Sequence, residues 1–97
     1  MSAYLISELT VRDPVAIEIY RSIAQASIAK YGGRYLVRGG TAEVVEGGPA
    51  PASLVIVEFP SMDRAWEWYG SPEYAEALKV RETALDRRLI FVEGVPG

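Results

Sequence analysis

The side chains that could carry chemistry in this sequence are arginines, glutamates and tyrosines. Histidine and cysteine are both absent, which removes the commonest general base, the commonest transition-metal ligand and any thiolate nucleophile. A proton transfer would therefore need a glutamate or a tyrosine, and an anionic or carbonyl-bearing ligand would need an arginine. These residues indicate a polar binding site without identifying a reaction.

Arg81 is the strongest candidate for an anion-binding residue. It is expected on the apolar face of a helix, between Leu78 and Leu85 at spacings of three and four. A fixed positive charge in that position needs a carboxylate, carbonyl groups or a bound anion. The alternatives are that Arg81 extends past the edge of the helix, or that it pairs with Glu58 or a strand-end carbonyl.

Glu58 is the candidate catalytic residue. It is a charged side chain on an otherwise apolar strand, where a carboxylate is either an ion-paired structural group or a base with a raised pKa. If residues 47–53 form a hairpin loop, Ala42 lies opposite Glu58 and Arg38 lies close to it, within one residue of register. Arg38 is therefore the second candidate for holding the ligand.

Tyrosines complete the expected ligand site. Each offers an aromatic wall and one hydroxyl to a cavity between helices and sheet, although ordinary core packing would also account for each of them. Trp68 lies off the apolar stripe shared by Trp66 and Tyr69, so it is expected at a boundary, as a dimer contact rather than a ligand contact. The expected ligand-binding residues are Tyr20, Tyr35, Arg38, Tyr69, Tyr74 and Arg81.

Four segments with strand patterns must position these residues. The first alternates apolar and polar residues, the third is almost wholly apolar and β-branched, and the second is interrupted by Gly39-Gly40, where a bulge or corner is expected. The predicted strands are residues 4–11, 34–38 with 42–46, 54–59 and 89–93.

Two helical segments lie between the strands. Asp13-Pro14 predicts the start of the first, and Gly32-Gly33 ends it near Lys30. Ser61 begins the second, which breaks at Gly70 and restarts at Ser71-Pro72.

This order of elements predicts an α+β, ferredoxin-like βαββαβ fold in a single domain covering residues 1–97. Right-handed crossovers give an antiparallel sheet of order 4-1-3-2 with both helices on one face. The other face carries Ile6, Leu54 and Ile56 or Phe91, and it is too apolar to be left in water. A second copy packed on that face would form a dimeric α/β barrel, so a homodimer is expected.

The composition limits the class of partner. The chain is 49% hydrophobic and 24% charged, as in a soluble globular domain, and its net charge is -3. It lacks the basic surface that binds phosphates, so neither nucleic acid nor an acidic membrane is expected. The N-terminal residues lack the pattern of a signal peptide or membrane span, which predicts a cytoplasmic protein. No cofactor and no metal site are expected.

Residues 31–40, with the sequence YGGRYLVRGG, resemble the signature of a family of small bacterial proteins catalogued as domain of unknown function 1330. The resemblance implies a ferredoxin-like, dimeric α/β barrel in a superfamily that also holds antibiotic-biosynthesis monooxygenases, muconolactone isomerases and haem-degrading enzymes. It implies no substrate, because the family has no settled activity. The similarity continues in one register through Val45-Glu46-Gly47, residues 57–61, Ala65-Trp66, Trp68-Tyr69, residues 71–74, Arg81 and Val92-Glu93-Gly94.

Two functional hypotheses follow. The first is a small-molecule binding protein or cofactor-independent enzyme with a pocket between helices and sheet, where Arg81 or Arg38 holds an anionic or carbonyl-bearing ligand. An isomerase or oxygenase-like reaction follows from the superfamily alone. The second is a non-catalytic, dimeric regulatory or stress-related module whose polar residues serve the interface. A cavity of small-molecule size would count against the second hypothesis.

Overall fold

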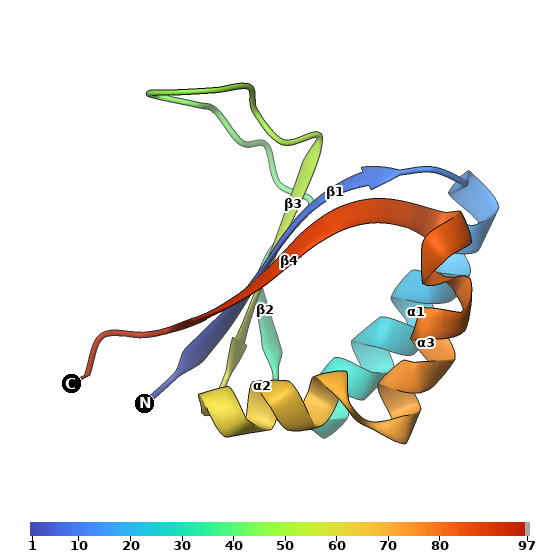
Figure 1. Cartoon of the computed structure of the whole chain (residues 1–97), viewed down its shortest axis with the longest axis vertical. Helices are drawn as coiled ribbons and strands as arrows, with labels where there is room; N and C mark the ends of the chain where they lie inside the picture. Colours follow the sequence, from blue (N-terminus) through green and yellow to red (C-terminus); the bar gives the residue numbers. More distant parts are fainter. Residues whose placement is uncertain (97) are drawn as a thin grey trace.

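The computed structural model describes residues 1–96, which form one four-stranded antiparallel sheet with all helices on the same face (Figure 1). The sheet order is β2-β3-β1-β4, so the predicted order 4-1-3-2 and the ferredoxin-like α+β arrangement are confirmed. None of the helices in these residues is both long and apolar enough to cross a membrane. The elements are β1 (Ala3–Val11), α1 (Pro14–Lys30), β2 (Arg34–Arg38), β3 (Ser53–Phe59), α2 (Met62–Tyr69), α3 (Pro72–Ala84) and β4 (Leu85–Glu93).

Local sequence signals set the ends of the helices. The Asp13 carboxylate accepts hydrogen bonds from the amides of Val15 (2.8 Å) and Ala16 (2.9 Å), which satisfies two otherwise free donors at the start of α1. Gly32, at φ +81°, turns the chain after α1. Ser71 caps α3 by accepting from the Tyr74 amide at 3.0 Å. The predicted helix starts and the break at Gly70 are confirmed.

Strand β2 differs from its prediction. It ends at Arg38, and residues 42–46, expected to continue it, form a loop instead. The Gly39 amide donates to the Leu54 carbonyl at 2.8 Å, and φ +71° at Gly39 then directs the chain away from the sheet. The bulge lies between Tyr35 and Val37 rather than at the double glycine. This loop projects beyond the sheet in Figure 1.

The register of β2 also differs from its prediction. Arg34, rather than Ala42, is the partner of Glu58, and Arg38 pairs with Val55. Because the bulge adds one residue between Tyr35 and Arg38, both side chains lie on the face of the sheet that α1 covers.

Strand β4 begins at Leu85, four residues before the predicted start, and pairs with β1 along its whole length. Its first part contains Asp86, Arg87 and Arg88, which conceal the apolar alternation on which the prediction depended. The alternation is nevertheless present, because Leu85, Arg87 and Leu89 share one face of the strand.

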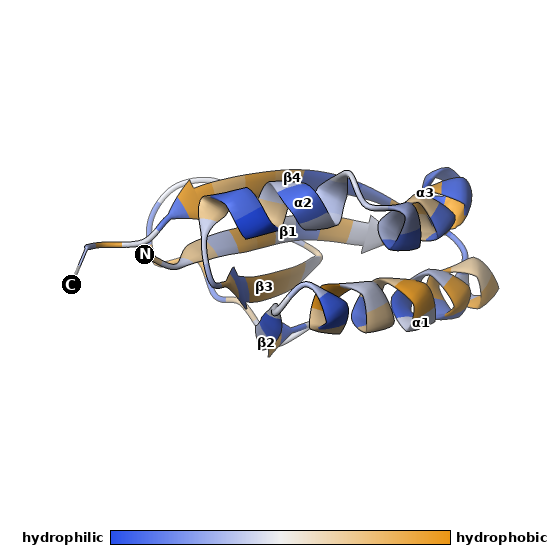
Figure 2. Ribbon diagram, turned by 90° about the horizontal axis from the view of Figure 1, so that it is seen from below, coloured by the Kyte–Doolittle hydropathy of each residue, from blue (hydrophilic) through white to orange (hydrophobic). Residues whose placement is uncertain are grey.

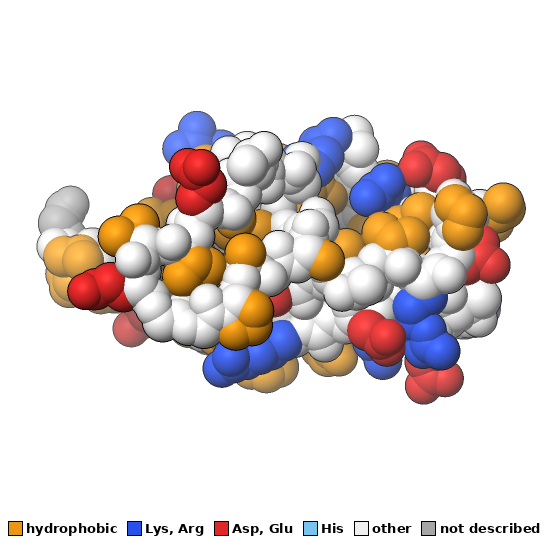
Figure 3. Space-filling view, turned by 90° about the horizontal axis from the view of Figure 1, so that it is seen from above, with side chains coloured by type: hydrophobic (Ala, Val, Ile, Leu, Met, Phe, Trp, Pro, Cys, Tyr) orange, Lys and Arg blue, Asp and Glu red, His pale blue; other side chains and the backbone are white. Residues whose placement is uncertain are grey.

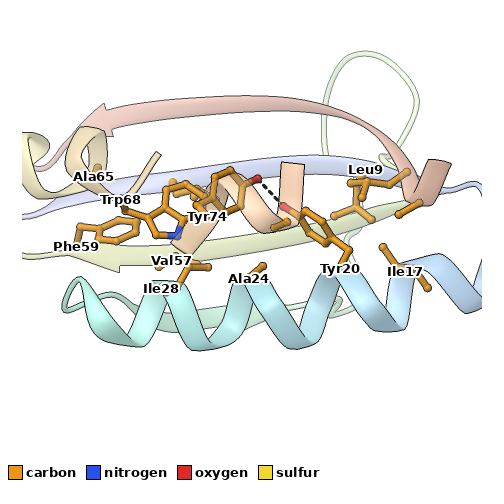
Figure 4. Packing of buried hydrophobic residues seen from close by; sticks show 14 residues of the cluster. Leu9, Ile17, Tyr20, Ala24, Ile28, Val57, Phe59, Ala65, Trp68 and Tyr74 are labelled. Atoms are coloured by element: carbon orange, nitrogen blue, oxygen red, sulfur yellow. Dashed lines mark hydrogen bonds between the residues drawn. The ribbon is translucent and has the colours of Figure 1, made fainter. Parts of the chain in front are cut away.

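The core lies between the helices and the face of the sheet that carries Leu85, Arg87 and Leu89 (Figures 2 and 4). Trp68 is only 1% exposed and packs on Phe59 and Tyr74, whereas Trp66 is 59% exposed. The prediction that placed Trp68 at a boundary was therefore wrong. Its indole N–H donates to Ser27 Oγ at 2.9 Å, a contact that can form only when α2 directs Trp68 inward.

None of the helices formed by residues 1–96 covers the opposite face of the sheet (Figure 1). Ile6 lies there between Ile56 and Ile90, and all three are partly exposed. Phe91, the alternative to Ile56 in the prediction, packs against the core on the helix side. A space-filling view from above shows hydrophobic side chains interspersed with charged ones (Figure 3).

Candidate functional site

A pocket of about 650 Å³ lies between α1 and the sheet. This volume is in the range of small-molecule sites. Small residues on both walls, Ser7 on β1 and Ala24 on α1, leave this space. The lining has an apolar part and a polar part, the polar part including Glu18, Arg21, Ser22, Gln25 and Ser53. The aliphatic side chains of the apolar part are Leu5, Leu9, Ile17, Ile28, Val55, Val57 and Leu85.

The polar centre of the pocket is a cluster formed by Arg87, Tyr20 and Tyr74. The two tyrosine hydroxyls lie 2.7 Å apart (Figure 4). Arg87 donates from Nη1 to the Tyr20 hydroxyl at 2.6 Å and from Nη2 to the Tyr74 hydroxyl. Each hydroxyl accepts from the arginine and only one proton can be shared between the rings, so the second phenolic proton remains available to another acceptor.

Tyr74 does not neutralise Arg87. Burial, reinforced by the neighbouring Tyr20, raises the pKa of Tyr74 far above its ordinary value, so its hydroxyl stays protonated. Within residues 1–96, no carboxylate lies within 4.0 Å of Arg87. The half-buried guanidinium thus faces the pocket as a cation with neutral hydrogen-bond partners, which is the arrangement that a ligand anion would complete.

Arg38 lies at the exposed end of the pocket. Its guanidinium is 3.9 Å from the centroid of the Tyr35 ring, a distance at which the ring attracts the cation and orients it. Burial raises the pKa of Tyr35, although Arg38 opposes this effect. The Glu18 carboxylate also lines the pocket and pairs with Arg21 at 3.0 Å, so a cation already neutralises it.

Ser7 contributes a polar atom to the floor of the pocket. It lies in the middle of β1 and is 3% exposed, and its Oγ has no hydrogen-bond partner within the described part of the chain. An unpartnered buried hydroxyl costs about 1 to 3 kcal/mol, so a ligand that bonded to it would recover free energy.

The structure brings most of the predicted ligand residues together. Tyr20, Tyr35 and Arg38 line the pocket, and Tyr74 hydrogen-bonds to Tyr20 without lining the pocket itself. Tyr69 does not line it: this residue is 37% exposed and packs edge-on against Trp66.

Arg81 also lies outside the pocket lining. It is half-buried on α3, and none of the described carboxylates lies within 4.0 Å of it. The arginine that reaches the pocket from this part of the chain is Arg87 instead, three residues beyond the end of α3.

Glu58 lies on the uncovered face of the sheet, away from the pocket. It pairs with Arg34 Nε at 2.6 Å and accepts from the Tyr4 hydroxyl at 3.4 Å. The hydrogen bond from Arg34 lowers its pKa, the opposite of the shift expected for a base. The ion-paired alternative therefore describes Glu58, and its expected neighbour Arg38 is replaced by Arg34.

Arg87 and Ser7 were not predicted as site residues. A period-two signal could have identified both: Arg87 alternates with Leu85 and Leu89, and Ser7 alternates with buried leucines on β1. No three histidine, cysteine, aspartate or glutamate side chains in residues 1–96 are grouped so that they could hold a metal ion.

Comparisons with known proteins agree with this fold. The model of the family described as "Domain of unknown function (DUF1330)" matches residues 2–95. No curated protein matches the sequence. A solved protein of unknown function from Rhodopseudomonas palustris is 24% identical, with a TM-score of 0.77 over 99% of this chain and 84% of that one.

More distant solved structures share the same fold. A cofactor-independent oxygenase from Streptomyces nogalater is 12% identical, with a TM-score of 0.68 over 99% of this chain and 95% of that one. A dimeric protein of unknown function and ferredoxin-like fold from Bacteroides fragilis is 18% identical, with a TM-score of 0.63 over 96% of each chain. At these identities the likeness shows the fold alone.

Proposed function

This chain belongs to the family described as domain of unknown function (DUF1330), as its sequence predicted, and we propose that it binds a small organic anion or carbonyl-bearing molecule between α1 and the sheet. The observation that carries the proposal is Arg87, a half-buried cation that faces the pocket and, among residues 1–96, hydrogen-bonds only to two tyrosine hydroxyls. The pocket itself counts against the alternative of a non-catalytic module without a cavity.

The lining supports a ligand with a flat apolar body and one negative or partly negative oxygen. The aliphatic walls favour a ring system, and Arg87 with the available phenolic proton offers two donors to one oxygen. A hydrogen bond to a charged group contributes about 1.5 to 3 kcal/mol. Anchoring by Arg87 is thus worth about a tenfold to hundredfold change in affinity.

The same arrangement suits one kind of chemistry. The interior supplies donors, and the carboxylate of Glu18 at the rim is paired with Arg21. Such a site stabilises an enolate or phenolate oxygen as its charge develops, rather than removing a proton from carbon. The proposed enzymatic role is therefore an isomerase or oxygenase-like reaction of an enolic or phenolic substrate, and the cofactor-independent oxygenase of the same fold gives a precedent.

We also propose that two copies pack through the uncovered face of the sheet. The row formed by Ile56, Ile6 and Ile90 is apolar and partly exposed, and a second sheet would remove it from water. The structurally similar protein from Bacteroides fragilis is described as dimeric. This arrangement leaves the pocket free, because the pocket is on the helix side.

Calorimetric titration with 2-naphthoate, a flat aromatic carboxylate, tests the proposed site. The wild-type protein should bind it, and Arg87→Gln should weaken binding at least tenfold. Arg88→Gln is the matched control, because Arg88 is the next residue on the same strand, points to the other face and makes only a 3.9 Å contact with Glu8. Equal binding by Arg87→Gln, or no binding by the wild type, would refute the proposal.

A further inference from the structure

We infer that the pocket is two-ended and takes an elongated, rigid molecule with an acidic group at each end; this inference rests on the proposed ligand site. Arg87 would hold one acidic group and Arg38 the other. The two arginines come from opposite edges of the sheet, β4 and β2, and both side chains lie on the face covered by α1.

The pattern of ion pairs singles out these two residues. Every arginine in residues 1–96 pairs with a carboxylate within 4.0 Å except Arg38, Arg81 and Arg87. Two of these three line the same pocket. The net charge of the chain is -3, so acidic side chains outnumber basic ones. Two cations in one cavity that have no carboxylate within 4.0 Å among residues 1–96 therefore indicate a site for negative charge.

The strand register gives the distance between the two ends. Arg38 lies opposite Val55, which lies opposite Ser7, while Arg87 lies opposite Leu9, two residues farther along β1. Three strand spacings and two residues of rise place the arginine Cα atoms roughly 16 Å apart. Side chains on one face of a sheet stand roughly perpendicular to it, so the two guanidinium groups are also roughly 16 Å apart. Allowing roughly 4 Å from each guanidinium for an ion pair leaves roughly 8 Å between two acidic groups, about the span of a two-ring dicarboxylate.

Ser7 supplies an independent observation between the two ends. Across the sheet, Ser7 is in register with Val55 and so with Arg38, and it lies two residues along β1 from Leu9, the partner of Arg87. Its buried Oγ lacks a partner in the described chain and lines the pocket. A hydroxyl or carbonyl oxygen on the central part of the ligand would satisfy this group.

A comparison of two probes tests the inference. The wild-type protein should bind naphthalene-2,6-dicarboxylate about tenfold more tightly than 2-naphthoate, since the second carboxylate gains a charge-assisted hydrogen bond. Arg38→Gln should abolish this preference, so that the variant binds naphthalene-2,6-dicarboxylate no more tightly than 2-naphthoate. Arg34→Gln removes the same charge from the same strand but at a residue paired with Glu58, and it should retain the preference.

The outcomes separate this inference from the proposed function. Equal affinities of the two probes for the wild type, or an unchanged preference in Arg38→Gln, would overturn the two-ended pocket while leaving a site at Arg87. Failure of both probes to bind the wild type would overturn both. Arg38 is exposed, so its variant should fold, and a thermal melt checks this.

Discussion

Replacing Ser27 by alanine should destabilise the protein, whereas replacing Ser7 by alanine should not. Both serines are buried, at 3% and 2% exposure, and the chemical change is the same. Ser27 Oγ donates to the Ala24 carbonyl at 2.8 Å and accepts from the Trp68 indole at 2.9 Å. Ser7 Oγ has neither kind of partner within residues 1–96.

The magnitudes follow from these contacts. Ser27→Ala leaves the buried indole N–H without an acceptor, which should lower the free energy of unfolding by about 1 to 3 kcal/mol. Ser7→Ala removes a hydroxyl whose desolvation is uncompensated, and the small void it leaves joins an existing pocket. Stability should therefore stay the same or rise by up to about 1 kcal/mol.

Thermal unfolding of the ligand-free proteins, followed by circular dichroism, measures the difference. For a chain of this size, 1 kcal/mol corresponds to about 4 to 8 °C in Tm. Ser27→Ala should melt at least about 4 °C below the wild type, and Ser7→Ala at or above it. If Ser7→Ala lowers Tm as much as Ser27→Ala does, the Ser7 hydroxyl has a structural role and is not a free hydrogen-bonding group for a ligand.

Three further predictions concern the frame around the pocket. The hydrogen bond from Lys30 lowers the pKa of Glu73 from 4.5 to about 2. Glu73→Gln should therefore lower Tm by its full amount above pH 4.5, and the difference in Tm from the wild type should vanish as the pH falls through 2, where wild-type Glu73 becomes protonated. A difference in Tm that does not depend on pH would contradict the ion pair. In urea titrations, Trp68→Leu should lower the free energy of unfolding by about 2 to 4 kcal/mol, whereas Trp66→Leu, at a position that is 59% exposed, should lower it by less than about 1 kcal/mol. Equal losses would contradict the inward orientation of Trp68. Gly33→Ala should destabilise the chain by about 1 to 3 kcal/mol in the same titrations, because its Cβ would come within 2.6 Å of a methyl group of α1 and 2.9 Å of an aromatic ring of β3; an unchanged midpoint would refute that close packing.

The sequence predicted the fold because its signals are local and agree with one another. Alternation in the strands, Asp13 before Pro14 and the break at Gly70 each specify an element without reference to distant residues. Once the elements are in order, few topologies remain. Tyr20 and Tyr35 could be proposed as site residues because the fold brings their segments to one face.

The features that the sequence did not predict depend on contacts between segments that are distant along the chain. Residues 39–52 form one long loop that moves the register of β2, and the bulge between Tyr35 and Val37 adds one residue more, so Glu58 pairs with Arg34 instead of lying close to Arg38. Helix α2 has only eight residues, and its orientation is set by the bond from Trp68 to a serine on α1 rather than by its own periodicity. Arg87 was missed because charged neighbours conceal the alternation at the start of β4.

The most direct test of the ligand site is an NMR titration of the labelled wild-type protein with 2-naphthoate, which locates binding as well as detecting it. If the pocket between α1 and the sheet is the site, the largest shifts should fall on the Arg87 side-chain N–H, the Trp68 indole N–H and the Ser7 amide. Signals from Ile6 and Ile56 on the uncovered face should change little. Shifts confined to that uncovered face, or the absence of shifts at Arg87, would contradict the assignment of this pocket as the functional site.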